Sequence, residues 1–369
     1  MSVLSLHEFH EQLGASFLEV NGAEVVADYG DIAAEHAALR NSAGVLDLSF
    51  RSRLCLLGAD RKTFLNGQVT NNVKDLATGF GCYAALVTAK GKMQSDLLVY
   101  CLQDELLLDF EPGLAEVVQQ RLEKYVIADD VQVVNVREAY GHLSIQGPCS
   151  AQVLAALALA PSLPETALTF VHSSDATLGD LYAMNHARAG TCGFDLFVPI
   201  QALGAVLDKL VASARAQGGR LVGWTALEQA RIEAAIPRFG ADMDETNLPP
   251  EAGLDSRAIH YAKGCYIGQE VIARLRTYGK VAKALRGLQW PIVPGEALPK
   301  KGDKIYWSEK EVGYVTSATA STDLSSGLAL AYIRREQNQV GAQLIIRTEL
   351  GPVSASVTTL PFQPFAVRG

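Results

Sequence analysis

The hydrophobic pattern divides the chain at about residue 279. Before this point, apolar runs at strand spacing alternate irregularly with runs at helical spacing. Strands are expected over 83–88, 95–102, 105–110, 131–136, 142–147 and 194–199, and helices over 112–127, 148–160, 202–219 and 224–235. Because these elements follow no strict strand–helix–strand repeat, the pattern predicts an α+β fold for this part of the chain.

After residue 279 the helical periodicity disappears. Short apolar segments with turn signals between them are expected as strands over 283–290, 304–308, 312–320, 329–333, 342–348 and 354–360. Several short strands in close succession are typical of a small β-barrel or sandwich. We therefore expect a separate β domain at the C-terminal end.

Composition and charge narrow the function classes. A chain of 369 residues is long enough for two or three domains, and its net charge of −8 argues against a general nucleic-acid-coating role. No apolar run reaches the ~18 residues that span a bilayer, and the start shows neither a secretory nor a transit pattern. We expect a cytoplasmic monomer. The six cysteines include no C-x-x-C pair, so no metal site is expected.

The stretch KGCYIGQEVIARLRTYGK, which begins at Lys263, places a cysteine before a predicted short helix. Gly268 suits the start of this helix, Glu270 its first turn, and Gly279 the position just past its end. Cys265 then lies just ahead of the helix N-terminus and close to Lys263, and both features favour the thiolate. The sequence is compatible with a reactive thiol and equally with a thiol buried in a loop between domains.

The same region is basic. Glu270 and Arg274 are four residues apart, a favourable helical pair. Glu270 is also the single acid among seven basic residues, which are Arg257, Lys263, Arg274, Arg276, Lys280, Lys283 and Arg286. Such a surplus indicates either a solvated face or a docking site for an anionic ligand or partner.

Two further side chains are candidates for a binding site. Asp96 opens an apolar strand directly after a glycine-containing turn, where its carboxylate could accept a ligand N–H or take part in acid–base chemistry. Arg231 lies in a predicted helix and could bind a carboxylate through two parallel hydrogen bonds. The alternatives are an ordinary turn-flanking aspartate and a solvated arginine.

Several segments, in order along nearly the whole chain, resemble the aminomethyltransferase (T-protein) of the glycine cleavage system. They are YGDIAAEHAALRNSAGVLDLS, FLNGQVTNNVKDL, KGKMQSDLLVY, LSIQGP, GFDLFVP and ARIEAAIPRFGADMDETNLPPEAGL. The stretch around Cys265 resembles a narrower group, the YgfZ-type folate-binding proteins, which assist iron–sulfur cluster assembly or repair and affect tRNA modification. T-proteins lack this cysteine.

The resemblance implies a three-domain ring around a tetrahydrofolate. Residues 1–278 would form two interleaved α+β domains that bind the folate, and residues 279–369 a C-terminal β-barrel. By similarity, Asp96 faces the folate, Arg231 belongs to its site, and Cys265 is the essential thiol. The YgfZ-type motif around that thiol comprises Lys263, Gly264, Gly268, Gln269, Glu270 and Arg274.

The chain departs from the T-protein pattern at two places. Ser95 precedes Asp96 where T-proteins usually carry two adjacent acids. Thr191 stands where the T-protein segment G-E-x-G-Y-E has the glutamate that holds the pterin, so we expect Thr191 at the folate site with a neutral hydroxyl. Loss of this carboxylate predicts folate binding without classical T-protein turnover.

The sequence therefore leads to one main hypothesis and two alternatives. The main hypothesis is a folate-binding protein that assists iron–sulfur cluster assembly or repair and thereby tRNA modification. Folate and iron–sulfur assembly or client proteins would be its partners, without direct nucleic-acid or membrane binding. The first alternative is a tetrahydrofolate-dependent aminomethyltransferase or methyltransferase, and the second is a scaffold that binds partners but no ligand.

Overall fold

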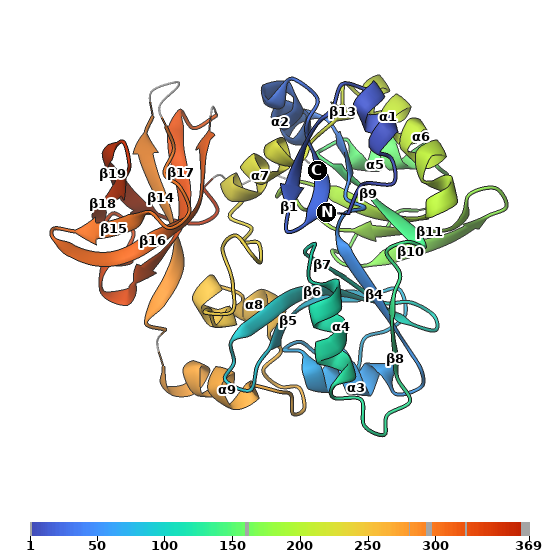
Figure 1. Cartoon of the computed structure of the whole chain (residues 1–369), viewed down its shortest axis with the longest axis horizontal. Coiled ribbons are helices and arrows are strands. Elements are labelled where there is room, and N and C mark those ends of the chain that lie inside the picture. Colours follow the sequence, from blue (N-terminus) through green and yellow to red (C-terminus); the bar gives the residue numbers. More distant parts are fainter. Residues whose placement is uncertain (1, 159–161, 280, 293–296, 322, 363–369) are drawn as a thin grey trace.

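The structure, a computed structural model, describes residues 2–158, 162–279, 281–292, 297–321 and 323–362. Three lobes surround a common centre, as Figure 1 shows: two mixed lobes of helices and sheet, and a barrel of strands. The predicted α+β class with a C-terminal β-barrel is confirmed. Within the described residues, no helix is long and apolar enough to cross a membrane.

The first lobe is built on a sheet with the strand order β10-β11-β12-β9-β3-β13, in which only the β3–β13 pair is parallel. Its strands are β3 (Gly44–Asp47), β9 (Tyr140–Gln146), β10 (Phe170–Asp175), β11 (Gly179–Asn185), β12 (Gly193–Pro199) and β13 (Arg220–Leu221). The lobe also holds the hairpin of β1 (Ser16–Val20) and β2 (Ala23–Asp28), and the helices α1 (His7–Gln12), α2 (Ile32–Asn41), α5 (Ser150–Ala155), α6 (Leu203–Ala216) and α7 (Trp224–Glu233). Leucines and valines at helical spacing on α6 are buried against this sheet.

The second lobe is built on an antiparallel sheet with the order β5-β6-β7-β4-β8. Its strands are β4 (Ser52–Leu57), β5 (Gly81–Val87), β6 (Met93–Cys101), β7 (Leu106–Phe110) and β8 (Gln132–Asn135), and its helices are α3 (Arg61–Gln68), α4 (Ala115–Glu123), α8 (Asp255–Ala258) and α9 (Gln269–Tyr278). Strand alternation gives this sheet two buried faces. Leu97 and Val99 pack with α3 and α4, whereas Leu98 and Tyr100 pack with Phe197 of the first lobe.

The chain passes back and forth between these two lobes. It leaves the first lobe after β3, builds β4 to β8 in the second, and returns for β9 to α7. It then adds α8 and α9 to the second lobe before it enters the barrel. As a result, residues far apart in the sequence meet where the lobes join.

The barrel closes through the strand order β14-β17-β16-β15-β18-β19, with β19 paired back to β14. Its strands are β14 (Lys283–Pro291), β15 (Lys304–Trp307), β16 (Lys310–Ser321), β17 (Ser326–Arg334), β18 (Gln343–Thr348) and β19 (Gly351–Thr358). Ile232 of α7 packs against Leu285, Leu330 and Tyr332 of the barrel. The domain boundary predicted between residues 278 and 279 stays a prediction, and it falls between α9 and β14.

Two predicted helices are shorter than their apolar pattern. The helix predicted from residue 112 begins at Ala115, because Gly113 has a φ of +77° and forms a turn that approaches the carbonyl of Asn21. The helix predicted over 148–160 is observed as Ser150–Ala155, and the end of the predicted range lies outside the described residues.

Candidate functional site

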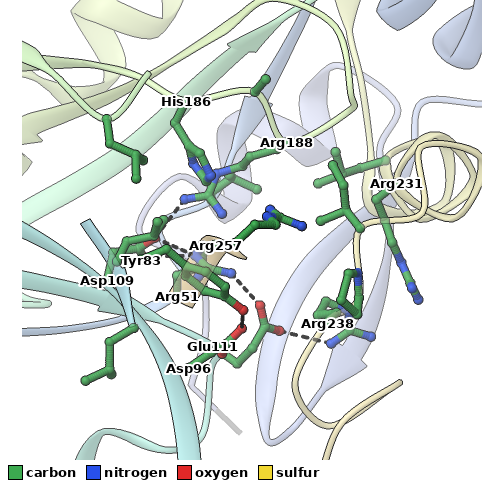
Figure 2. Close-up of a pocket in the computed structure, with 18 of the residues that line it drawn as sticks. Arg51, Tyr83, Asp96, Asp109, Glu111, His186, Arg188, Arg231, Arg238 and Arg257 are labelled. Atoms are coloured by element: carbon green, nitrogen blue, oxygen red, sulfur yellow. Dashed lines mark hydrogen bonds and ion pairs between the residues drawn. The ribbon is translucent and has the colours of Figure 1, made fainter. Parts of the chain in front are cut away.

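A cavity of about 390 Å³ lies where the second lobe's sheet meets α7 and the loops of residues 186–188 and 236–238. Leu48, Trp224 and Leu227 give it apolar walls. Its acidic and basic lining residues, shown in part in Figure 2, are Arg51, Asp96, Asp109, Glu111, His186, Arg188, Glu228, Arg231, Arg238 and Arg257. A concave site with apolar walls and converging polar groups has the properties of a small-molecule site.

Asp96 reaches the cavity because successive side chains of β6 point to opposite faces of the sheet. Its neighbour Leu97 is buried, and Asp96 is half-buried beside Tyr83 of the adjacent strand β5, whose hydroxyl donates a hydrogen bond of 2.8 Å to Oδ2. Burial, together with the negative charge of Glu111, raises the pKa of Asp96 to about 6. This carboxyl group therefore titrates near neutral pH, where it can accept a ligand N–H or exchange a proton.

Arg51 and Arg238 hold the acids at the end of β7. Arg51 donates from Nε to both carboxylate oxygens of Asp109, at 2.9 and 3.1 Å, and from Nη1 to Glu111 at 2.6 Å. Arg238 donates to the other oxygen of Glu111 at 3.0 Å. Although burial opposes it, the charges of Arg51 and Arg188 hold the pKa of Asp109 well below its ordinary value. Both carboxylates are thus already bound by arginines of the protein.

A second buried group joins this one from the first lobe. Arg188 donates from Nε to both oxygens of Asp195 at 2.9 Å and from Nη2 to Asp109 at 2.7 Å. His186 lies 2.9 Å from Asp195 through Nδ1. Burial and the neighbouring Arg188 lower the pKa of His186, so its imidazole is neutral at pH 7. The charges therefore tie the two mixed lobes together along one wall of the cavity.

Arg231, which the sequence placed in the folate site, lines the cavity, but other side chains occupy its guanidinium group. It is 4 % exposed and binds Asp242, donates to Glu228 at 2.8 Å, and donates to Ser317 of barrel strand β16 at 2.8 Å. Buried arginines of this kind hold their partners in place, because removal of the cation would leave the carboxylates unpaired. The geometry makes Arg231 a link between α7 and the barrel.

Thr191 does not line the cavity. Its hydroxyl is directed to backbone carbonyls and donates to Leu39 of α2 and to Cys192, both at 3.4 Å. The expected placement of Thr191 at the folate site stays a prediction, and the lining of this cavity does not include the residue. The sequence motif locates this segment but does not determine where its side chains point. The acid that this segment does bring to the cavity wall is Asp195, through Arg188.

Residues 263–274, here called the thiol segment, lie against the second lobe. Lys263 donates from Nζ to three carbonyl oxygens, those of Asn66, Val69 and Asn71, at 2.6, 2.7 and 2.6 Å. Burial lowers its pKa to about 8. An ammonium group has three donors, so none remains for Cys265. The expected support of the thiolate by Lys263 is therefore replaced by a structural role in holding the loop.

The predicted helix of the thiol segment is confirmed as α9, with Gly268 before its first residue. Gly268 has a φ of +85°, and a Cβ there would lie 2.4 Å from the carbonyl oxygen of Thr88, so a larger residue would disrupt the contact with the β5–β6 turn. Gln269 accepts a hydrogen bond of 3.1 Å from the backbone of Tyr266. The remaining predicted motif residues are exposed to solvent: Gly264, Cys265, Glu270 and Arg274.

The structure does not bring the thiol segment and the cavity together. Asp96 and Arg231 line the cavity, whereas no residue of the segment does. Cys265 is exposed, which excludes the alternative of a buried loop thiol, whereas Cys55 and Cys101 are buried. Of the basic surplus, Arg257 lines the cavity and Lys280 lies outside the described residues.

Sequence reasoning missed most of the charged lining. Asp109 and Glu111 stand at the end of an otherwise apolar strand, and Arg51 stands just before another. Charged residues at such positions are a signal, because lone charges are rarely buried without partners. However, the sequence does not indicate which residue pairs with each charge, because the partners are distant in sequence: Arg238 lies 127 residues from Glu111.

Comparison with known families agrees with this architecture. The model of the GCVT N-terminal domain matches residues 6–263, and the model of the glycine cleavage T-protein C-terminal barrel domain matches residues 283–363. Together they cover the two mixed lobes and the barrel.

Two relatives that match this chain over nearly its full length are named aminomethyltransferase. A protein from Halalkalibacterium halodurans named aminomethyltransferase is 26% identical over 97% of this chain and 96% of its own length. One of the same name from Halothermothrix orenii is 28% identical over 98% of this chain and 100% of its own length. The crystal structure of glycine cleavage system aminomethyltransferase T from Bartonella henselae superposes with a TM-score of 0.87 at 23% identity, covering 98% of both chains. At this identity the likeness concerns the fold, and it confirms the expected T-protein architecture.

Proposed function

Because the chain belongs to the family of the GCVT N-terminal domain, we propose that it binds a reduced folate in the cavity, with Asp96 against the pterin ring. Asp96 carries this proposal, since it is the cavity carboxylate that no arginine holds in an ion pair among the described residues. Its free oxygen can accept the N–H groups that a pterin presents.

The shape and lining of the cavity support a folate. Its volume of about 390 Å³ falls within the range of small-molecule pockets, roughly 300–1,000 Å³. Leu48, Leu227 and Trp224 supply apolar surface for flat rings, and Asp96 supplies a polar group that fixes orientation. The tetrahydrofolate predicted from the sequence is therefore the ligand that we assign to this site.

The activity that the cavity best supports is transfer of an aminomethyl or methyl group to the folate. The full-length relatives are named aminomethyltransferase. Asp96 titrates near pH 6, so it can hold or release a proton close to the reacting nitrogen. Thr191, whose neutral hydroxyl is expected to oppose this turnover, does not line the cavity.

Cys265 favours a second candidate function, assistance in iron–sulfur cluster assembly or repair and thereby in tRNA modification. The thiol is exposed and lies just before α9, outside the cavity. A solvent-exposed thiolate can act on a partner protein or a cluster, which are too large for a cavity of this size. In this case the protein would have two separate functional sites, the folate in the cavity and the thiol of Cys265 on the surface.

Anaerobic calorimetry with tetrahydrofolate tests the binding site. We expect the wild-type protein to bind and Asp96→Ala to bind at least roughly tenfold more weakly, because the variant loses a hydrogen-bond acceptor for charged or polar N–H groups. Absence of binding by the wild type would overturn the proposed site.

Two assays separate the candidate activities. A reconstituted glycine-cleavage reaction with the other components supplied measures transfer, which should depend on Asp96 and not on Cys265. Complementation of a bacterial strain that lacks a YgfZ-type protein measures the second function, which should be lost with Cys265→Ser and kept with Cys192→Ser. Cys192 is the matched control because it too is exposed.

A further inference from the structure

Five arginines line the cavity, and four of them are held by carboxylates. Arg51 binds Asp109 and Glu111, and Arg188 binds Asp195 and Asp109. The same holds for the two arginines of the α7 side, Arg231 and Arg238, which share Glu228. Their positive charges are therefore neutralised within the protein, and a ligand anion would have to compete with bound carboxylates.

Arg257 is different. Among the residues that the structure describes, its side chain forms no hydrogen bond or ion pair, and its Cζ atom lies 5.7 Å from the centre of the Tyr83 ring. It stands on the short helix α8 and is exposed, although it lines the cavity. We read this combination as a guanidinium group at the opening, with its five N–H donors available.

Tyr83 connects this cation to the free carboxylate. Its hydroxyl donates to Asp96, and its ring lies beside Arg257. The cavity thus offers, next to the same tyrosine, a carboxylate oxygen that can accept and a guanidinium group that can donate two parallel hydrogen bonds. A ligand that matches both groups carries N–H donors at one end and a carboxylate at the other.

We propose that Arg257 binds the glutamate tail of the folate at the opening of the cavity. This inference rests on the proposed folate site and assigns to it a residue that determines specificity for the anionic tail. At neutral pH the pterin ring is uncharged, and the glutamate carries the ligand's negative charges. A planar guanidinium group matches a carboxylate through two parallel hydrogen bonds. Arg231, expected from the sequence for a folate-binding role, is left to hold α7 on the barrel.

The test measures tetrahydrofolate affinity by anaerobic calorimetry at low and high salt. Arg257→Ala should weaken binding roughly ten- to hundredfold at low salt, as expected for loss of hydrogen bonds to a charged group. Arg257→Lys should fall between the two, because an ammonium group keeps the charge but loses the fork geometry. Binding by the wild type should weaken with salt more than binding by Arg257→Ala, because an exposed ion pair is screened.

Arg334→Ala is the matched control, since Arg334 is an exposed arginine at the end of barrel strand β17 and does not line the cavity. It should leave affinity and salt dependence unchanged. If the wild type binds and Arg257→Ala binds equally well, or with the same salt dependence, this inference fails while the folate site stands. If the wild type binds no tetrahydrofolate, the folate site fails and takes the inference with it. A lowered unfolding midpoint in Arg257→Ala would show that Arg257 stabilises the fold, and this result would overturn its role in binding the glutamate tail.

Discussion

The cavity and the thiol segment are held in different ways. In the cavity, charged side chains from distant parts of the chain bind one another, such as Arg51 with Asp109 and Arg238 with Glu111. In the thiol segment, Lys263 binds backbone carbonyl oxygens that are also distant in sequence, such as that of Asn66, while Cys265 remains exposed. Both regions are thus fixed by the tertiary fold, but the first encloses its charged groups, whereas the second presents its thiol to solvent.

This difference teaches where each kind of function can reside. A preorganised cavity with paired charges suits a small ligand, because its free groups are few and fixed. An exposed segment suits a larger partner. If the two regions act independently, changes in one should leave the other unaffected, and the following predictions examine this from the largest expected effect to the smallest.

The largest effect is expected for the charge pairs of the cavity wall. Arg231→Ala leaves Asp242 without its cation and Glu228 with Arg238 alone, and loss of one partner of a buried ion pair typically costs about 3–5 kcal/mol. We expect the free energy of unfolding to fall by about this amount, measured by denaturant titration.

Arg274→Ala in the thiol segment is the comparison variant for that measurement, because Arg274 is exposed. It should change the free energy of unfolding by no more than about 0.5 kcal/mol. Equal losses in both variants would contradict the distinction between a structural wall and an outward-facing segment.

A smaller effect is expected for the cavity's free carboxylate. Asp96→Asn keeps the size of the side chain but removes its charge and one of its acceptor oxygens. We expect roughly a tenfold loss of tetrahydrofolate affinity, since hydrogen bonds to charged groups contribute more than neutral ones. Asp104→Asn, an exposed aspartate outside the cavity lining, should bind like the wild type. Unchanged affinity in Asp96→Asn would contradict the proposed contact between the pterin and this carboxylate.

The pH dependence of binding follows from the same group. Burial and Glu111 raise the pKa of Asp96 to about 6, so its carboxylate is ionised above that pH and protonated below it. A ligand N–H binds the ionised form, and affinity should therefore fall as the pH decreases through about 6 and below. Calorimetry between mildly acidic and neutral pH measures this fall, and Asp96→Asn should flatten it. A profile that is the same in both proteins would assign the titration to another group.

What the sequence could predict follows the same division. The barrel strands, α9 and its start at Gly268 are local patterns of alternation and helix ends, and the structure confirms them. Asp96 could be found because it stands at a strand end after a turn. The bound state of Arg231 and the direction of Thr191 could not, because each depends on partners brought together by the fold, Asp242 and Leu39.

The smallest effect concerns the thiol and its independence from the folate. Cys265 precedes the N-terminus of α9, whereas Cys192, also exposed, precedes strand β12. Because both thiols are exposed, alkylation at neutral pH should label them faster than the buried thiols of Cys55 and Cys101. Cys82 should react slowly, because burial raises its pKa to about 12. Peptide mapping after brief alkylation measures these rates. Since Cys265 does not line the cavity, saturating tetrahydrofolate should leave its rate unchanged, and protection by the ligand would show that the two regions are coupled.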